Sequence, residues 1–579
     1  MNKREKRDEA ASSVGRRVWM KQAAALTGGV AAGALLPAEA SARAPKAAPN
    51  GSGNTVVAAG DSKAVVETTA GKVRGYVRNG IYTYKGIPYA GTTAGEARYQ
   101  PPTKPVPWAG VRSSMQYGSV CPQVARAGWA NDEEAWLFSW DDGIPGEDHL
   151  RVNVWTPGIR GAGEDKKRPV MFWIHGGGFQ AGSGQELPSY DGENLSRRGD
   201  VVVVSVNHRL GVLGYLNLAE IGGAKYADSA NLGQLDLVAA LAWVRDNIAN
   251  FGGDPNNVTI FGQSGGGSKV GTLMAMPAAR GLFHRAIVQS GSGLRMATSD
   301  NTSRLAAAVL SELGLSASQL DRLHTLPVQT IVGAGVAALR KLQPPGGGMR
   351  VFQRRADRVG WAPTVDGRIL PQHPFDPAAP SISAQVPMLI GTTLNEFTSA
   401  INNPKAEALT EEDLAARVKE MYGDRSREIV AAYRRANPQA KPFDILSFIS
   451  TVPTRHNAVT QAELKTAQGA APAYLYLFTW QTPVLDGRPR AFHCAKLAFV
   501  FDNIDRCANM TGGGADARAL AAKMSEAWIA FARKGDPNHP GLPKWSAYSA
   551  DKGPTMIFDN KCEIRNDPDG PARRTITMA

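Results

Sequence analysis

The chain reads Asn257-Val258-Thr259-Ile260-Phe261-Gly262-Gln263-Ser264-Gly265-Gly266-Gly267, where a β-branched and aromatic run passes into glycines. Residues 268–276 follow with a composition that suits a helix. Strand, sharp turn and helix form the setting in which a G-x-S-x-G motif presents a nucleophilic serine, because only small neighbours permit the strained turn. Ser264 is therefore the candidate nucleophile, and the start of the helix would favour negative charge developing beside it.

A second glycine-rich segment, His175-Gly176-Gly177-Gly178-Phe179, follows an apolar, strand-like run at residues 168–174. Consecutive glycines leave backbone N–H groups open to a reacting carbonyl, as an oxyanion hole requires. A flexible turn is the alternative, whereas a phosphate-binding loop is disfavoured because its usual motifs are missing. A lone G-x-S-x-G match is weak in a chain with 62 glycines, and this second motif strengthens it.

Apolar strand candidates alternate with helix-like stretches, a pattern that predicts an α/β fold with a mixed central sheet. In a helix expected at 515–533, one apolar face indicates core packing. Residues 297–384 and 400–470 are the least regular parts, and we expect them to supply helices that cap the pocket. The other expected elements are a helix at 232–250 and strands at 73–84, 152–155, 170–174, 201–206, 258–261, 286–289, 388–390, 473–480 and 555–558.

The composition limits the classes of protein that the chain can be. Its 579 residues are 43% hydrophobic and 20% charged, which excludes disorder and collagen, and four cysteines do not make a cysteine-stapled miniprotein. The formal net charge is +13, but the longest basic clusters are pairs such as Arg354-Arg355. A nucleic-acid-binding protein would concentrate its charge in a stripe, so we expect no nucleic-acid partner.

The first residues have the order of an export signal. Arg16-Arg17 precede an apolar stretch at 23–36 and small residues at 38–42, and this resembles a bacterial twin-arginine signal. We therefore expect residues 1–42 to be removed and the protein to be periplasmic or secreted. A single anchoring helix is the alternative, although the stretch is shorter than the ~20 residues that span a bilayer. Residues 43–62 are expected to be a disordered tether, and 63–579 a single domain with no stable membrane anchor.

Six segments, which together span roughly residues 64–568, stand out: Gly86-Ile87-Pro88-Tyr89-Ala90, Asn153-Val154-Trp155-Thr156-Pro157, His175-Gly176-Gly177-Gly178-Phe179, residues 207–211, Asn250-Phe251-Gly252-Gly253-Asp254-Pro255 and Phe531-Ala532-Arg533-Lys534-Gly535-Asp536-Pro537. They resemble signatures of the type-B carboxylesterases, the α/β-hydrolases that include cholinesterases and para-nitrobenzyl esterases. This resemblance implies the α/β-hydrolase fold: a mixed, mostly parallel central sheet flanked by helices, with helical insertions around an active-site gorge.

A serine hydroxyl is a poor nucleophile at neutral pH, so a histidine must accept its proton and a carboxylate must fix that histidine's tautomer. In this fold class the chain order is serine, acid, histidine, which leaves six of the nine histidines. Of these, His493 follows the strand expected at 473–480 and resembles the family's catalytic histidine segment. His284, before a core strand, is better explained as structural, and His456 and His539 as surface residues.

Glu396 is the candidate acid. An apolar strand at 386–391 leads into Thr392-Thr393-Leu394-Asn395-Glu396-Phe397, and catalytic carboxylates of this architecture lie on loops at the carboxyl ends of strands. The family's motif at this point ends in its triad glutamate. Asp366 is the alternative, but Asp366-Gly367 favours a turn and the matching family segment is structural.

By resemblance, the backbone N–H groups of Gly177, Gly178 and Gly265 form the oxyanion hole. Losing one such donor typically costs ~3 kcal/mol in the transition state. Because these donors are main-chain groups, side-chain substitution does not test them cleanly.

Aromatic residues indicate where a substrate would bind. The loop between residues 131 and 148 corresponds to one wall of the family's gorge, and it carries both acidic and aromatic side chains. We expect Trp136, Trp140 and Phe179 to contact the substrate by stacking or cation–π interactions. A solvated loop anchored by packed aromatic residues is the alternative.

The chain departs from the family's pattern at three positions. Gln263 stands where cholinesterase-like members have a glutamate, which weakens the case for cationic choline substrates. His149 stands in place of a cysteine, so Cys121 cannot form the family's disulfide. Lys496 stands where the family often has an acid, and the pattern explains no effect of that change. The carboxylates near His149 lack metal-ligand spacing, so we expect no metal.

Taken together, the motifs predict hydrolysis of a carboxylic ester through an acyl-enzyme on Ser264. His493 is expected to act first as base and then as acid, with Glu396 orienting it. A small-molecule ester is the expected partner, and no cofactor is implied. An amide or carbamate substrate stays open, as does a non-catalytic binding or adhesion protein on the same scaffold. The intact set of nucleophile, base, acid and oxyanion loop favours the enzyme.

Overall fold

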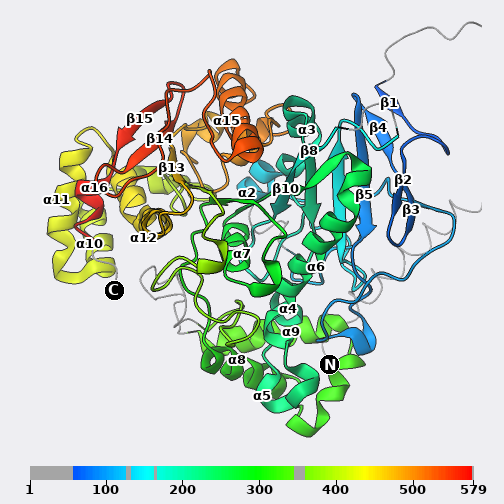
Figure 1. The fold of residues 1–579 in the computed structure, drawn as a ribbon. Coiled ribbons are helices and arrows are strands. Elements are labelled where there is room, and N and C mark those ends of the chain that lie inside the picture. The colour runs from blue at the N-terminus through cyan, green and yellow to red at the C-terminus, as the bar shows by residue number, and fades with distance from the viewer. Residues whose placement is uncertain (1–55, 126–131, 162–165, 344–358, 577–579) are drawn as a thin grey trace, which may run out of the picture. The chain divides into compact units, whose positions relative to one another are not determined.

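A twelve-stranded sheet runs through the residues that the computed structural model describes, namely 56–125, 132–161, 166–343 and 359–576 (Figure 1). Its inner strands are parallel and its outer strands antiparallel, which confirms the predicted mixed, mostly parallel sheet. Across the sheet lie β1 (Val57–Ala58), β4 (Tyr76–Arg78), β5 (Ile81–Pro88), β7 (Arg151–Thr156), β9 (Val202–Val206), β8 (Arg168–Ile174), β10 (Gly253–Gln263), β11 (Arg285–Gln289), β12 (Met388–Thr393), β13 (Ala473–Phe478), β14 (Pro554–Phe558) and β15 (Glu563–Asn566).

Strand β8 shows why the sheet is covered on both faces. Its side chains alternate between two cores, with Phe172 and Ile174 in one and Met171 and Trp173 in the other. Alternation of apolar residues on both faces is expected of a parallel strand buried between two helical layers. The first core lies under α6 (Leu232–Asn247), α7 (Gly265–Met274) and α12 (Pro442–Ala467), and the second under α3 (Glu193–Gly199), α13 (Leu497–Val500) and α15 (Ala515–Lys534).

The strand predicted at 73–84 is wrong, because three elements occupy it. β3 (Gly71–Arg74) belongs to a separate sheet with β2 (Val65–Thr68) and β6 (Val111–Ser113), whereas β4 and β5 form a hairpin in the large sheet. The hairpin turns at Asn79 and Gly80, whose φ angles of 49° and 79° lie in the left-handed region. Asn-Gly is the pair that favours such a two-residue turn, and the apolar run around it concealed the break.

The two irregular regions do supply helices, as predicted. Residues 297–384 provide α8 (Ser299–Glu312) and α9 (Val328–Leu342), which share a separate apolar cluster with α4 (Gly211–Tyr215). Residues 400–470 provide α10 (Glu411–Tyr422), α11 (Ser426–Ala436) and α12. In α12, Ala458, Val459 and Ala462 pack into the core beneath the sheet, while the hydroxyl of Thr451 accepts from the N–H of Glu396 at 3.0 Å.

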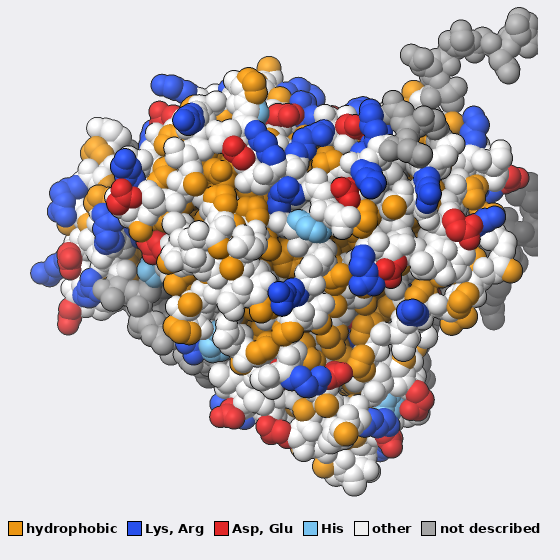
Figure 2. Space-filling view, in the orientation of Figure 1, with side chains coloured by type: hydrophobic (Ala, Val, Ile, Leu, Met, Phe, Trp, Pro, Cys, Tyr) orange, Lys and Arg blue, Asp and Glu red, His pale blue; other side chains and the backbone are white. Residues whose placement is uncertain are grey.

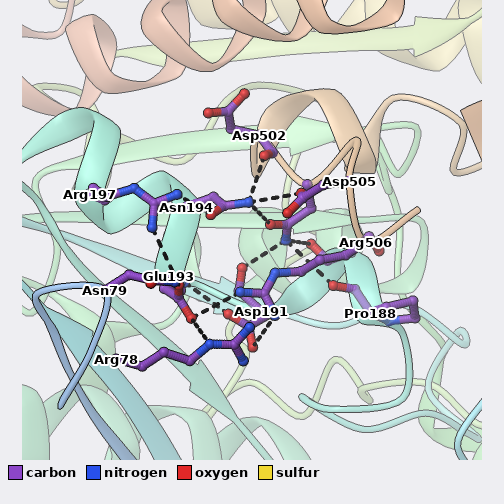
Figure 3. A network of polar contacts seen from close by, with 12 residues as sticks. Arg78, Asn79, Pro188, Asp191, Glu193, Asn194, Arg197, Asp502, Asp505 and Arg506 are labelled. Atoms are coloured by element: carbon purple, nitrogen blue, oxygen red, sulfur yellow. Dashed lines mark hydrogen bonds and ion pairs between the residues drawn. The ribbon is translucent and has the colours of Figure 1, made fainter. Parts of the chain in front are cut away.

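Helix α3 is fastened by the polar network drawn in Figure 3. Asn194 Nδ2 donates to the carbonyl of Asp502 at 3.0 Å. The Glu193 carboxylate accepts from Asn79 Nδ2 at 2.6 Å, so the network joins α3 both to the β4–β5 hairpin and to the segment after α13.

The predicted export signal at 1–42 and most of the tether predicted at 43–62 lie outside the described residues. Within the described part, no helix combines the length and the hydropathy of a membrane span. On the face drawn in Figure 2, cationic and anionic side chains are interspersed. That face of the protein therefore carries mixed charge.

Candidate active site

The turn that carries Ser264 joins β10 to α7. Ser264 has φ 57° and ψ −124°, a conformation that is costly for a residue with a side chain. The glycines beside it are required by close packing, because a Cβ on Gly266 would lie 2.1 Å from the carbonyl oxygen of Ile174. The serine is partly exposed, whereas its neighbours are buried. The predicted strand, sharp turn and helix are therefore present.

The three predicted oxyanion donors converge at this turn. Gly177 and Gly178, which follow β8, have φ angles of 77° and 64°. A Cβ on Gly265 would lie 2.2 Å from the carbonyl oxygen of Gly178, so the two backbones touch. The carbonyl of Gly177 accepts from the N–H of Ala181 at 3.1 Å, which anchors the loop.

Glu396 and His493 come from the loops that follow β12 and β13. A backbone hydrogen bond from the N–H of His493 to the carbonyl of Glu396, 3.0 Å long, sets the two loops side by side. Nδ1 of His493 lies 2.5 Å from Oε2 of Glu396, and the glutamate side chain is fully buried. The carboxylate therefore fixes the tautomer that leaves Nε2 able to accept a proton.

Several groups keep Glu396 ionised. Its Oε1 accepts from the N–H of Thr393 at 2.8 Å. Burial acts to raise its pKa, but His493, the cation of Lys496 and the hydroxyl of Ser290 together lower the pKa from 4.5 to about 2. Lys496 is itself buried and donates to Ser290. The lysine that the family pattern left unexplained thus supplies positive charge behind the acid.

Nε2 of His493 is occupied by a residue that sequence reasoning did not assign to the base. The side-chain Nε2 of Gln263 lies 2.9 Å from it. Gln263 directly precedes Ser264, so the imidazole reaches the strand end that carries the serine. In this structure, however, Nε2 of His493 contacts the side-chain amide of Gln263. No local pattern indicates such a contact, because it depends on how two distant loops meet.

The predicted aromatic residues differ in their placement. Trp136, in α2 (Asp132–Phe138), is 48% exposed. The ring of Trp140 packs 5.2 Å from that of Phe138. Phe179 is only 3% exposed and its ring packs against the core residue Tyr215. The structure thus places Phe179 inside the protein rather than on an open wall.

Phe397 is an aromatic residue that the sequence analysis did not select. Its ring lies 4.3 Å from that of His493, and it is 49% exposed. It directly follows Glu396, so the same loop carries the acid and an aromatic surface beside the base. An exposed aromatic residue immediately after a candidate acid was the signal that could have identified it.

The alternative acid, Asp366, lies in a turn. Its Oδ1 accepts from the N–H groups of Arg368 at 2.9 Å and Leu370 at 3.0 Å. The structural interpretation of Asp366-Gly367 is therefore correct. Among the described residues, no cluster of three or more His, Cys, Asp or Glu side chains has the arrangement of a metal site.

Comparisons with known proteins agree on one group of enzymes. The model of the carboxylesterase family matches residues 62–572. The para-nitrobenzyl esterase of Bacillus subtilis (strain 168) is 36% identical over 520 residues, which cover 88% of this chain and 98% of that protein. The phenmedipham hydrolase of Pseudarthrobacter oxydans is 31% identical over 525 residues, covering 89% and 100%. Among solved structures, a carboxylesterase of Geobacillus stearothermophilus has a TM-score of 0.73 at 35% identity, covering 89% of this chain and all of that one.

Proposed function

Because the chain belongs to the carboxylesterase family and is a carboxylic ester hydrolase, we propose that it forms its acyl-enzyme on Ser264, with His493 as the base and Glu396 as the acid that orients it. The observation that supports this most directly is the buried Glu396–His493 pair, whose ring reaches the residue preceding Ser264. A structural carboxylate and imidazole would not need to meet at a strained serine turn.

In the first half-reaction the Ser264 oxygen attacks the ester carbonyl while its proton passes to Nε2 of His493. The same proton then goes to the departing alcohol oxygen, and water repeats the sequence to release the acid. Nε2 has one lone pair, and the amide of Gln263 donates to it. That hydrogen bond must therefore break before the Ser264 hydroxyl can transfer its proton to Nε2. The carbonyl oxygen, negative in the tetrahedral intermediate, would accept from the N–H groups of Gly177, Gly178 and Gly265.

The acyl-enzyme can be tested by a pre-steady-state burst of para-nitrophenol from a para-nitrophenyl ester. We expect a burst of one equivalent per active site, and Ser264→Ala should reduce turnover by about 10⁴-fold or more. Ser525→Ala is a matched control, because Ser525 is a buried serine of α15 that donates to the carbonyl of Ala521. Equal rates from wild type and Ser264→Ala would support the binding-protein alternative and reject the proposal.

We further propose that the substrate carries an aromatic group near the scissile bond. The ring of Phe397 packs at a tilt against that of His493 with half of the Phe397 surface exposed, and Trp136 is similarly exposed. Phe179 is the least open of the predicted contacts, because its ring is buried. The relatives' names, which refer to a para-nitrobenzyl ester and to phenmedipham, support the same direction.

A panel of matched substrates would test this preference and the bond type. Of the para-nitrobenzyl and ethyl esters of one acid, the para-nitrobenzyl ester should have the higher kcat/KM. Phe397→Ala should reduce the ratio of the two kcat/KM values. Anilides, carbamates and phenmedipham in the same panel decide whether amide or carbamate cleavage accompanies ester cleavage. A faster rate with an anilide than with the matched ester would change the assignment to an amidase.

Export is a separate proposal. The order of Arg16-Arg17, an apolar stretch and small residues supports removal of residues 1–42 and a periplasmic or secreted enzyme. Replacing both arginines by lysine should leave precursor inside the cell, whereas the wild type should yield shortened protein outside the inner membrane. Equal distribution of the two forms would contradict a twin-arginine route.

A further inference from the structure

Helix α7 contains a buried lysine for which neither the proposed mechanism nor the predicted motifs have a use. Lys269 is fully buried, five residues after Ser264. Its Nζ donates to the carbonyl oxygens of His175 at 3.1 Å and Gly176 at 3.4 Å. Both carbonyls belong to the glycine loop that carries two of the candidate oxyanion donors.

The peptide geometry links this lysine to one of those donors. The carbonyl of Gly176 and the N–H of Gly177 belong to one planar trans peptide group, so they point in opposite directions. A donor that holds the carbonyl therefore fixes the direction of the N–H. The next peptide group is held in the same manner, but by the backbone, since the carbonyl of Gly177 accepts from Ala181.

Lys269 is thus the charged contact on the first of these two peptide groups. The Gly176 carbonyl also lies 3.1 Å from Nδ1 of its neighbour His175. A charge-assisted hydrogen bond is stronger than a neutral one, and it draws electrons toward the carbonyl oxygen, which makes the N–H at the other end a better donor.

One carboxylate, two imidazoles and one aromatic ring surround Lys269 in addition to the carbonyls of the loop. The attraction of the buried Glu186 acts to raise the lysine's pKa, although burial, the larger effect, lowers it to about 7. On the side of the loop, the rings of His175 and His208 stack 4.8 Å apart. Burial and the charge of Lys269 hold the pKa of His208 well below its usual value, so that imidazole stays neutral. The ring of Phe179 lies 5.9 Å from Nζ.

A buried lysine is a costly way to fill this space. Methionine has a similar length and would avoid the cost of burying an ammonium group. We propose that Lys269 is a positioning residue for the oxyanion hole. Its ammonium group holds the loop's carbonyls so that the N–H of Gly177 faces the oxyanion that forms when Ser264 attacks. This inference rests on the proposed function, because it assumes that the glycine loop stabilises that oxyanion.

The chain offers a matched control for this lysine. Lys465, in α12, is also fully buried and donates to two consecutive carbonyls, those of Ser383 at 3.2 Å and Ala384 at 2.6 Å. Residues 383 and 384 precede β12, whereas Glu396 follows it. Lys465 therefore lies near the amino end of β12, and the candidate acid lies after its carboxyl end. Lys465 also donates to Oε1 of Gln468 at 2.9 Å, so Lys465→Met removes at least as many contacts of a buried lysine as Lys269→Met does, but away from the glycine loop.

The decisive probe is a trifluoromethyl ketone, which reports on the oxyanion without a leaving group. The Ser264 oxygen adds to the ketone carbon, the C=O π bond breaks to give an alkoxide, and the serine proton moves to His493. At pH 6, where a lysine with a pKa of about 7 is mostly protonated, Lys269→Met should weaken this inhibitor and lower kcat by about 10- to 100-fold each, with KM within about threefold of wild type, because the contact acts on the transition state. Lys269→Gln, a neutral donor, should fall between, and Lys465→Met should match wild type within about twofold.

Unchanged ketone affinity in a folded Lys269→Met or Lys269→Gln would overturn the proposal. If both variants failed to fold while Lys465→Met folded, Lys269 would be assigned to the fold, and the proposal would fail as well. The wild-type protein separates this inference from the proposed function. A wild type that turns over esters independently of Ser264 would reject the function, whereas Ser264-dependent turnover with equal ketone binding in the variants would reject only the role of Lys269.

Discussion

The network around Glu193 and the site around Ser264 both depend on buried charge, but they distribute their contacts differently. Figure 3 shows the first arrangement, in which one carboxylate has many partners. Glu193 accepts from Asn79 at 2.6 Å, Arg506 at 2.9 Å and Arg197 at 3.3 Å, and it pairs with Arg78 at 3.3 Å. The loss of one of these donors leaves three others on the same oxygens.

In the site around Ser264, each functional group has fewer side-chain partners. One side chain, that of Glu396, lies 2.5 Å from Nδ1 of His493. One ammonium group, that of Lys269, spans two carbonyls of the oxyanion loop. A shared network spreads the effect of a substitution over many contacts, whereas a sparse one concentrates it on a single atom. We therefore expect substitutions in the network to change stability and substitutions in the site to change chemistry.

The largest effect should come from Glu396→Gln. A neutral amide can hold the wrong tautomer of His493, and we expect kcat to fall by about 10⁴-fold with little change in KM. Asp366→Asn is the matched control, because Asp366 was the competing carboxylate and its oxygens accept turn N–H groups. Rates with a para-nitrophenyl ester decide the assignment. A loss confined to Asp366→Asn would give the acid role to that residue.

The difference between the two regions also determines what could be predicted from the sequence. The juxtaposition of Glu396 and His493 follows from chain order and from loops at the carboxyl ends of neighbouring parallel strands, which are properties of the fold. The turn at Ser264 follows from its own glycines. Such features are local or topological, and a single sequence contains them.

The contacts of Gln263 and Lys269 could not be predicted in that way. Each depends on the distance between a helix or strand end and a loop far away in the chain, and the same residue types elsewhere are surface groups. A lysine within the small, apolar turns of α7 was a signal of burial, but not of its partners. The hairpin of β4 and β5 was missed for the opposite reason, since the local Asn79-Gly80 signal was present and the apolar run outweighed it.

The next largest effect belongs to the network. Glu193→Gln removes the charge shared by three arginines from a buried position, and we expect a loss of about 3 kcal/mol in the free energy of unfolding. Urea denaturation measures this loss, and kcat of the folded variant should stay within about twofold of wild type. A large fall in kcat at full folding would show that the network acts on the chemistry and would break the comparison.

A smaller effect is the contribution of Lys269 to the pH dependence of the free energy of unfolding. The pKa of Lys269 is about 7 in the folded protein and 10.5 when exposed, so between these values the unfolded chain binds more protons than the folded one. Stability from this group therefore rises with pH from about 7 to 10.5. Lys269→Met removes that rise, so the wild type should gain about 2 kcal/mol relative to the variant between pH 7.5 and 9. Chemical denaturation at both pH values measures it, and a constant difference would contradict a buried lysine that is mostly protonated below pH 7 and mostly neutral above it.

The smallest effect should come from Arg197→Met, at the rim of the network. Its side chain is 47% exposed and its contact with Glu193 is an i,i+4 pair within α3, and such pairs contribute about 0.5 kcal/mol or less. Arg506→Met is the sharper partner experiment, because Arg506 reaches the same carboxylate at 2.9 Å with a side chain only 18% exposed. If the partners of the shared carboxylate contribute separately, Arg506→Met should lower the free energy of unfolding more than Arg197→Met but less than Glu193→Gln. Equal losses from all three variants would mean that the network unfolds as one unit, and its redundancy would then give no protection.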